Sequence, residues 1–464
     1  MLNRKLRERL EAHGQQHVLA FWDQLDAAQR AGLVEQLEQI DLDLIERLAA
    51  DDSDQPDFSE LARRAQPPPA IRLSAGAQAD VTEAGRASGR EALAAGTVGA
   101  VLVAGGQGSR LGFDLPKGMF PIGPLSGASL FQILLEKIAA SSRRYASRVP
   151  LFVMTSPATD APTREYLDSN DYFGLPAEDV VVFCQGTMPA VAAESGRLIL
   201  ADRDQLFLSP DGHGGMLAAL RRSGAWGEMQ RRGLRHLFYF QVDNPLGTVC
   251  DPELIGHHIL ANSQYTLQVV ARRQADDKVG NVVSIDGTAQ IIEYSDLPAE
   301  AAGRRAADGS LELWAGSIAV HVFDIDFLAA SVADGAALPF HRALKKVPYV
   351  DAAGQRIDPH EANAIKFEQF IFDLLPRAAQ TLSVEVERDA AFAPLKNAPG
   401  SSADTQQHVQ QQMMALDRAR LRACGVEVAD SVRVEISPLF ALDIEQLKAK
   451  LGSGMRINQD TYFR

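Results

Sequence analysis

The sequence contains little cysteine and little tryptophan, with three of each among 464 residues. Cys184, Cys250 and Cys424 lie far apart, so they outline neither a disulfide framework nor a paired-cysteine zinc site. No apolar run approaches membrane-spanning length, and the segment Met1–Leu10 carries too much charge for a secretory signal. We therefore expect a protein of the cytoplasm, where thiols stay reduced, with no membrane partner.

The chain also has fewer basic than acidic residues. The chain has 46 Lys and Arg residues against 60 Asp and Glu, which gives a formal net charge of −14. A general basic face for nucleic acid is therefore not expected, although a local cationic pocket can still bind an anionic substrate. The composition is ordinary for a globular protein, and the length is sufficient for two or three domains.

The stretch Val98–Gly118 carries the strongest chemical signal. An apolar run of strand length leads into G-G-Q-G-S-R-L-G, and the stretch ends in P-K-G. Glycines let backbone N–H groups approach an anion closely, and Arg110 and Lys117 add charge-assisted bonds to phosphate oxygens. The spacing fits neither the dinucleotide fingerprint G-x-G-x-x-G nor the P-loop G-x-x-x-x-G-K-[ST]. We therefore predict another type of phosphate-binding loop, after the first strand of an α/β domain.

The periodicity of the chain changes near Thr97. Before it, residues 2–50 have helical spacing with Asp41 placed to cap the last helix, and 51–75 are typical of a linker. After it, short apolar runs alternate with amphipathic segments, which predicts an α/β fold with a mostly parallel sheet flanked by helices. The expected strands are Gly99–Ala104, Leu151–Ser156, Val180–Gln185, Leu237–Val242 and Thr266–Arg272. We expect an N-terminal helical region and linker at 1–96, the α/β domain at 97–400 and a small C-terminal domain at 401–464.

Several local patterns add detail. Ser129 and Gln132 have the spacing of a helix capping box, and Asp286-Gly287 predicts a two-residue hairpin turn. A strand region at Leu311–Ile325 is expected to be interrupted at 315–317. Amphipathic spacing predicts a helix at Phe367–Leu375 with Lys366 at its N-terminal end, and the tail is expected to carry a helix at Gln406–Arg422 and a strand at Val432–Ile436.

Further motifs follow in a fixed order along the chain. They are Q-G-T-M-P from Gln185, P-D-G-H-G-G from Pro210, V-D-N ending at Asn244, V-G at Val279-Gly280, I-E-Y-S from Ile292, K-F-E from Lys366 and P-L-K-N-A from Pro394. With the glycine-rich loop, this series resembles the eukaryotic-type UTP-dependent UDP-sugar pyrophosphorylases, the group that includes UDP-N-acetylhexosamine pyrophosphorylase and UTP–glucose-1-phosphate uridylyltransferase. The resemblance covers nearly the whole chain. It implies the nucleotide-diphospho-sugar transferase fold, a Rossmann-like mixed sheet, with a catalytic domain at 97–400.

The resemblance implies a nucleotide site with contributions from several motifs. The uracil and ribose would lie against the backbone of four residues, Val103, Ala104, Gly105 and Gly106. Gln185 would bind the uracil imide edge, since an amide offers both a donor and an acceptor; a buried Gln with no ligand is the alternative. Gly212 would border the junction of nucleotide and sugar, and Lys366 would close over the phosphates.

The same resemblance implies the catalytic groups. Arg110 would stabilise the pyrophosphate end, Lys117 the α-phosphate region and Lys396 the sugar phosphate. Asp243 is the expected Mg²⁺ ligand, because Mg²⁺ uses one or two carboxylates together with substrate phosphates. The alternative for Asp243 is a residue that caps the following turn.

The sugar is expected to contact His213, Gly280, Glu293 and Ser317. Glu293 would accept hydrogen bonds from sugar hydroxyls, although an exposed strand-end Glu is its alternative, and Gly280 would leave room for a sugar substituent. The family often has Asn where this chain has Ser317, so a shorter side chain faces the sugar. The sugar preference therefore stays open.

The implied reaction joins UTP and a sugar-1-phosphate into a UDP-sugar and pyrophosphate, with N-acetylglucosamine-1-phosphate as the expected substrate. Glucose-1-phosphate and galactose-1-phosphate are the alternatives. A catalytically silent nucleotide-sugar-binding regulator is a second alternative, which the presence of Arg110, Lys117, Asp243, Lys366 and Lys396 disfavours. A nicotinamide dehydrogenase is a third, and the failed G-x-G-x-x-G spacing disfavours it.

Overall fold

The computed structural model describes residues 3–50, 57–73, 78–333, 338–452 and 454–464. The chain forms two compact units, each built from several segments. The smaller unit contains Met1–Asp57, Gln185–Ala218 and Ala337–Asp373, and the larger unit contains Phe58–Cys184, Ala219–Ala336 and Leu374–Arg464. The expected division of the chain near 96 and 400 stays a prediction. Among the described residues, no helix combines the length and apolar character needed to cross a membrane.

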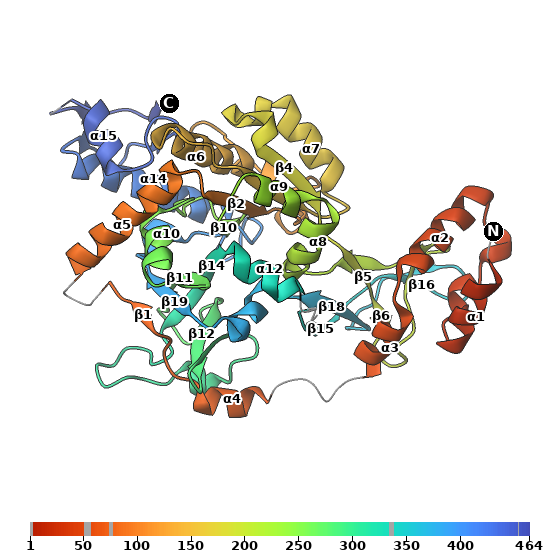
Figure 1. Ribbon diagram of the computed structural model, residues 1–464. Coiled ribbons are helices and arrows are strands. Elements are labelled where there is room, and N and C mark those ends of the chain that lie inside the picture. The colour runs from red at the N-terminus through yellow and green to blue at the C-terminus, as the bar shows by residue number, and fades with distance from the viewer. Residues whose placement is uncertain (1–2, 51–56, 74–77, 334–337, 453) are drawn as a thin grey trace. The chain divides into compact units, whose positions relative to one another are not determined.

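A mixed sheet forms the centre of the larger unit (Figure 1). In sheet order its strands are β1 (Ala70–Ile71), β19 (Thr381–Glu385), β11 (Tyr265–Ala271), β14 (Ala315–Asp324), β10 (His236–Gln241), β2 (Val98–Val103), β3 (Leu151–Thr155) and β4 (Val180–Cys184). β14 runs antiparallel to β10 and β11, and the other neighbouring pairs along this order are parallel. The predicted α/β class with a mostly parallel sheet is confirmed.

The strands predicted from apolar runs are all present, and their bounds shift by at most one residue. The predicted interruption at 315–317 is wrong, because Ala315–Ser317 is the first part of β14. The irregularity lies slightly later. The pairing register shifts between Gln268 and Val269 of β11, and Ala319 of β14 has a φ of 56°. A local bulge therefore takes the place of a break.

Helix α6 (Leu130–Arg144) follows the glycine-rich loop. The backbone N–H of Gln132 donates to Ser129 Oγ at 3.0 Å, which confirms the predicted cap. The side chain of Gln132 donates to Glu136 at 2.9 Å. The Ser129 side chain therefore caps the helix, while the Gln132 side chain bonds to a residue one turn further along and not back to Ser129.

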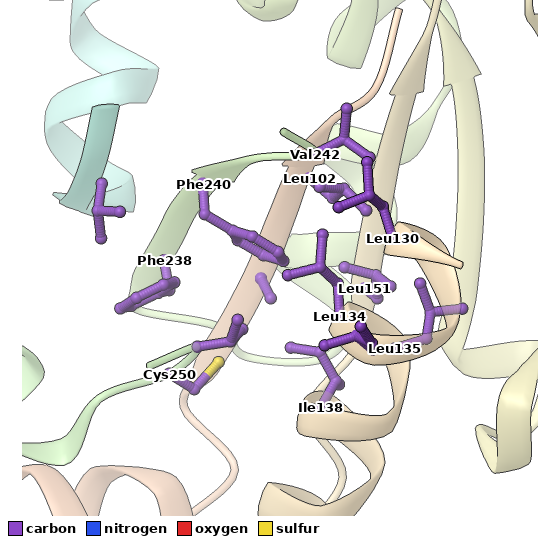
Figure 2. Close-up of a cluster of buried hydrophobic side chains, with 14 of the residues drawn as sticks. Leu102, Leu130, Leu134, Leu135, Ile138, Leu151, Phe238, Phe240, Val242 and Cys250 are labelled. Atoms are coloured by element: carbon purple, nitrogen blue, oxygen red, sulfur yellow. The ribbon is translucent and has the colours of Figure 1, made fainter. Parts of the chain in front are cut away.

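A dry apolar core joins α6 to the sheet. Apolar side chains at one-turn intervals along the helix meet strand residues, as Figure 2 shows for Leu130, Leu134, Ile138, Leu102 and Phe240. Burial of such side chains stabilises the fold by about 25 cal/mol per Å² of apolar area. The loop between β2 and α6 is therefore anchored at both ends on a well-packed base.

The predicted hairpin is confirmed as β12 (Gly280–Ile285) and β13 (Thr288–Ile292). Asp286 and Gly287 between them have φ values of 51° and 82°. Positive φ at both central residues defines a type I′ turn, whose twist matches that of a hairpin. β12 also pairs with β14, so that Gly280 lies opposite Ser317.

The end of the chain carries helices α14 (Gln406–Ala423) and α15 (Ile444–Lys450). They accompany two short parallel strand pairs, β20 (Glu427–Val428) with β22 (Arg456–Ile457) and β21 (Val434–Ile436) with β23 (Thr461–Phe463). The predicted helix is confirmed, and the predicted strand is shorter than expected.

The linker expected at 51–75 is wrong in part, because it contains α4 (Phe58–Arg64) and β1. The apolar and small residues of α4 pack on the β12–β13 hairpin, where they share a buried cluster with Val283 and Ile292. β1 pairs with β19 at the edge of the main sheet. The remaining positions at 51–56 and 74–75 lie outside the described residues.

The smaller unit combines helices with a short sheet. Its helices are α1 (Arg4–Ala12), α2 (Ala27–Gln39) and α3 (Leu42–Ala50), and its sheet has the order β15 (Phe340–Lys345), β18 (Ala364–Gln369), β6 (Val191–Ala192). The helical N-terminal region is confirmed. The N–H of Leu44 donates to Asp41 Oδ1 at 3.0 Å, so Asp41 caps α3 as predicted.

The helix predicted at Phe367–Leu375 is wrong. Residues up to Gln369 belong to strand β18, and a 3₁₀ segment follows at Ile371–Arg377. Phe367 is buried whereas Lys366 and Glu368 are half-buried, which is the two-residue alternation of a strand. Antiparallel pairing with β15 overrides the helical spacing, and Lys366 is therefore a mid-strand residue.

Candidate active site

The glycine-rich loop leaves β2 and folds back on itself. Lys117 N–H donates to Gly106 O at 3.0 Å, and Gly108 N–H donates to Leu115 O at 3.0 Å. Gly106 has no positive φ, and no described atom would lie within 4 Å of a Cβ placed there. Neither the backbone conformation nor the neighbouring residues therefore require glycine at this position. An open space beside the backbone is what close approach of a ligand would need.

The base of the loop is fixed by backbone contacts to the adjacent strands. Ala104 N–H donates to Met154 O at 2.8 Å, and Val242 N–H donates to Val103 O at 3.1 Å. The hydroxyl of Ser156 donates to Gly105 O at 2.7 Å. The carbonyls of Val103 and Gly105 are thus occupied, and the predicted nucleotide-contacting segment starts from a rigid strand end.

Four of the predicted charged residues interact within the larger unit. Lys117 Nζ lies 3.9 Å from Asp243 Oδ2, and both side chains are largely buried. Burial lowers the pKa of Lys117; Asp243 raises it, and the positive charges of Lys396 and Arg110 lower it further. Three cations share one small region with a single carboxylate, so an anion such as a phosphate would relieve their repulsion.

Backbone contacts bring Asp243 and Lys396 together from distant parts of the sequence. Asp243 follows β10, and its carbonyl accepts the N–H of Leu395 at 2.8 Å. Asn244 is buried; its amide donates to Ala391 O at 2.8 Å, and its Oδ1 accepts the N–H of Ala393 at 3.1 Å. The V-D-N and P-L-K-N-A motifs are therefore hydrogen-bonded to each other. Lys396 directly follows Leu395, the residue that contacts Asp243.

The carboxylate of Asp243 fits a metal shared with a substrate. Among the described residues its side chain has one charged neighbour, Lys117, at a distance longer than a hydrogen bond. No group of three or more His, Cys, Asp or Glu residues in the described chain is arranged to hold a metal ion by itself. A single carboxylate with free oxygen lone pairs suits Mg²⁺, which takes its remaining ligands from phosphates and water.

Three of the predicted sugar-contacting residues lie close together: Gly280 on β12, Glu293 directly after β13 and Ser317 on β14. Gly280 pairs with Ser317, and a Cβ on Gly280 would lie 3.2 Å from Glu293 Oε1. The side chain of Ser317 bends toward its own strand, where Oγ accepts the N–H of Ala319 at 3.3 Å. A Cβ on Gly280 would also lie 2.8 Å from Ile291 Cγ2, so the close packing of Ile291 and Glu293 against this backbone requires glycine.

The other predicted residues belong to the smaller unit. Gly212 has a φ of 84°, and a Cβ there would lie 2.4 Å from Gln369 O, so the backbone at the end of β18 requires glycine.

The ring of His213 packs 5.3 Å from that of Phe370 and 5.8 Å from that of Phe372, centre to centre. Burial, together with the nearby His341, lowers the pKa of His213 to about 4. Ile371 N–H donates to His213 Nδ1 at 3.1 Å. His213 is therefore neutral at pH 7 with its proton on Nε2, a donor and not a base.

Gln185 and Lys366 complete the predicted set. Gln185 comes directly after β4 and is 8% exposed. Lys366 Nζ lies 4.8 Å from the centre of the Phe207 ring. Burial lowers the pKa of Lys366, Glu368 raises it, and Lys345 lowers it further. The lysine is thus a partly desolvated cation on a strand.

The sequence analysis did not identify two residues that support the site, one at the glycine-rich loop and one at the loop 243–247, called the Asp243 loop below. Ser156 holds the carbonyl of Gly105, and Lys137 on α6 donates to carbonyls that follow Asp243. A signal for Lys137 was present, since it interrupts an apolar helix face next to Ile138. Its partners were not predictable, because they lie more than a hundred residues away in the chain.

Comparison with known proteins decides the family. The sequence profile described as "UTP--glucose-1-phosphate uridylyltransferase" matches residues 64–434. The chain belongs to this family. The predicted family, fold and nucleotidyltransferase class are therefore confirmed, whereas the roles of individual site residues stay predictions.

Relatives of this uridylyltransferase-family chain extend over most of its length. The UDP-N-acetylhexosamine pyrophosphorylase-like protein 1 of Xenopus tropicalis is 34% identical over 475 residues, with 97% of this chain and 92% of the relative covered. The UDP-N-acetylglucosamine pyrophosphorylase of Saccharomyces cerevisiae is 35% identical, with 78% of each chain covered. The crystal structure of the uridine diphosphate N-acetylglucosamine pyrophosphorylase from Trypanosoma brucei matches with a TM-score of 0.78 at 26% identity, over 96% of this chain and 93% of that one.

Proposed function

We propose that this enzyme joins UTP and N-acetylglucosamine-1-phosphate into UDP-N-acetylglucosamine and pyrophosphate. The observation that carries the proposal is the grouping of Asp243, Lys396 and Arg110 near Lys117, in the loops that follow β2 and β10 and in the P-L-K-N-A motif. Ligands of α/β sheets bind at the carboxyl ends of strands, and this cluster has the charge to bind phosphates. The names of relatives at 34% and 35% identity support N-acetylglucosamine as the sugar.

The reaction needs no general base. A phosphate oxygen of the sugar-1-phosphate attacks the α-phosphorus of UTP, the bond from that phosphorus to the bridging oxygen breaks, and pyrophosphate leaves with the electron pair. The attacking oxygen is already anionic near neutral pH, so no proton has to be removed. Neutral His213, held by Ile371, fits a binding role and not a proton-transfer role.

The protein therefore acts by positioning and by electrostatics. We assign Arg110 to the departing pyrophosphate, Lys117 to the α-phosphate and Lys396 to the sugar phosphate. Each cation lowers the repulsion between two anionic substrates and stabilises charge that develops in the transition state. Lys396 and Arg110 each disfavour the charged form of Lys117, and a bound anion would offset this repulsion.

Mg²⁺ is the proposed metal, with Asp243 as its protein ligand. When bound, the ion supplies charge neutralisation on phosphate oxygens. Asp243 is well suited to this role because its backbone is hydrogen-bonded to Leu395 and its carboxylate keeps lone pairs available.

The remaining assignments concern the nucleotide and the sugar. We assign the backbone of Val103–Gly106, Gln185, Gly212 and Lys366 to UTP. The sugar is assigned to His213 and to the group of Gly280, Glu293 and Ser317, where glycine at position 280 lets the Glu293 carboxylate approach the backbone closely. The free cysteines of the described chain support a reducing compartment, and we propose the cytoplasm.

The test is pyrophosphate release from UTP and Mg²⁺ with four sugar-1-phosphates: N-acetylglucosamine, N-acetylgalactosamine, glucose and galactose. We expect the highest kcat/KM with N-acetylglucosamine-1-phosphate. A higher kcat/KM with glucose-1-phosphate or galactose-1-phosphate would change the proposed sugar substrate and leave the proposed reaction type unchanged. UTP binding without pyrophosphate release from any of the four would overturn the proposal in favour of a nucleotide-binding regulator.

A further inference from the structure

The loop that carries Asp243 is also held by a half-buried lysine on α6. Lys137, near the middle of α6, donates from Nζ to three successive carbonyls, those of Pro245 at 2.5 Å, Leu246 at 3.3 Å and Gly247 at 2.7 Å. An ammonium group has three N–H donors, so all of them have an acceptor on this one loop. Carbonyl dipoles directed at a single point repel one another, and an ammonium group at that point offsets the repulsion.

We propose that Lys137 is a positioning residue that fixes the Asp243 loop in the conformation needed for catalysis. Asn244 binds the loop to the chain at Ala391 and Ala393, and Lys137 binds it to α6 on the other flank of the same segment. Asp243 lies immediately before the residues held in these two ways. The inference rests on the proposed function, because it gives Asp243 a role at the phosphates.

The surroundings of Lys137 distinguish it from a surface lysine. Burial lowers its pKa to about 7; the positive charge of Arg420 also lowers it, whereas Asp417 raises it. Asp417 and Arg420 lie on α14, and with Lys137, Leu246 and Thr248 they line one cavity between α6, α14 and the loop. An ionisable side chain is kept at this site despite the cost of burying its charged form. Packing alone would be served better by a Leu or a Met.

The C-terminal segment contributes to the same arrangement. Asp417 Oδ2 accepts the N–H of Ile436 at 3.0 Å, and Ser437 Oγ donates to Glu136 at 3.0 Å. Glu136 is the neighbour of Lys137 on α6. The final segment of the chain therefore closes over the helix residue that holds the loop.

The experiment compares Lys137→Met, Lys137→Arg and the exposed control Lys448→Met in the full-length enzyme. In Lys137→Met we expect a fall of about tenfold or more in kcat, a higher Mg²⁺ concentration for half-maximal rate, and a smaller change in KM for the sugar phosphate. Lys137→Arg keeps several N–H donors and is expected to recover most of the rate. Lys448→Met is expected to behave as wild type.

A second readout does not depend on turnover. Hydrogen–deuterium exchange of peptides that cover residues 242–250 is expected to speed up in Lys137→Met, while exchange in β2 and β3 stays unchanged. Unchanged exchange at 242–250 together with an unchanged Mg²⁺ requirement would overturn the proposal, and so would an equal loss of rate in Lys137→Arg with a wild-type exchange pattern. If the wild-type enzyme releases no pyrophosphate, the proposed function fails, and the exchange experiment still tests whether Lys137 fixes the loop.

Discussion

The two units place their candidate ligand-binding residues in different ways. In the larger unit, Lys117 lies 3.9 Å from Asp243, and the positive charges of Lys396 and Arg110 lower the pKa of Lys117. In the smaller unit, Gly212 fits against the backbone of Gln369, and His213 packs on aromatic rings. The first arrangement brings like charges together, which lowers the stability of the protein and favours binding of an anion. In the second arrangement, close packing fixes the positions of the residues. Substitutions in the larger unit should therefore affect turnover, and substitutions in the smaller unit should affect folding.

The largest expected effect comes from Arg110→Ala. The residue is exposed on a loop, so its loss should leave the melting temperature nearly unchanged. Removal of a group that stabilises transition-state charge lowers kcat by about 10²–10³-fold. Pyrophosphate release and a thermal melt measure the two quantities, with the exposed Arg222→Ala as the matched control. A wild-type rate in Arg110→Ala would remove this residue from the catalytic set.

Gly212→Ala tests the smaller unit. A Cβ at this position would meet the carbonyl oxygen of Gln369 at 2.4 Å, and the φ of 84° is unfavourable for alanine. We expect a loss of about 3 kcal/mol in the free energy of unfolding, measured by urea denaturation. Gly224→Ala is the matched control, because its φ is 78° and no described atom would lie within 4 Å of the new Cβ; it should lose about 1 kcal/mol. Equal losses in both variants would contradict the packing role of Gly212.

Lys117→Arg tests the electrostatics of the cluster through pH. Burial, opposed by Asp243 and assisted by Lys396 and Arg110, lowers the pKa of Lys117 below the ordinary lysine value. The protonated form is the one that binds phosphate, so kcat/KM should fall as pH rises through this lowered pKa. Arginine stays charged, and the variant should show a smaller alkaline decline even if its rate is up to about tenfold lower. An identical alkaline decline in Lys117→Arg and in wild type would contradict the assignment, and Lys448→Arg serves as the control.

The smallest expected effect concerns sugar choice. Ser317→Asn restores the longer side chain that is common in the family and places an amide opposite Gly280. We expect kcat/KM to rise for N-acetylglucosamine-1-phosphate relative to glucose-1-phosphate by about three- to tenfold, which corresponds to one added hydrogen bond. The ratio of the two values measures the effect independently of enzyme concentration. No change in this ratio would place residue 317 outside the sugar site.

The sequence predicted the elements whose signals are local. The apolar runs of β2, β3, β4, β10 and β11 were sufficient to locate these strands, since burial on both faces of a parallel sheet leaves a continuous apolar pattern. Lys366 shows where local reasoning fails, because helical spacing around Phe367 was overridden by pairing with β15. The bulge near Ala319 also had no local signal, since a positive φ at alanine depends on its neighbours in the sheet.

The sequence was sufficient to predict which residues belong to the candidate site, but not how these residues are arranged in space. The motifs named Asp243 and Lys396, yet the hydrogen bond from Leu395 to Asp243 that places them side by side is a tertiary contact. The role of Lys137 was missed for the same reason, because its acceptors are backbone carbonyls, which carry no sequence signature. The family resemblance predicted the roles of the site residues, whereas the structure was needed to show which other residues hold them in place.

The pairing of β1 with β19 has a consequence for the order of folding. Ala70 and Ile71 are made early, but their partners Ser383 and Val384 leave the ribosome more than three hundred residues later. At about 5–20 residues per second, this wait lasts tens of seconds. Leu395, which meets Asp243, emerges in the same late segment. The edge of the sheet and the proposed catalytic loop therefore mature together, and a chain truncated before this segment would lack both.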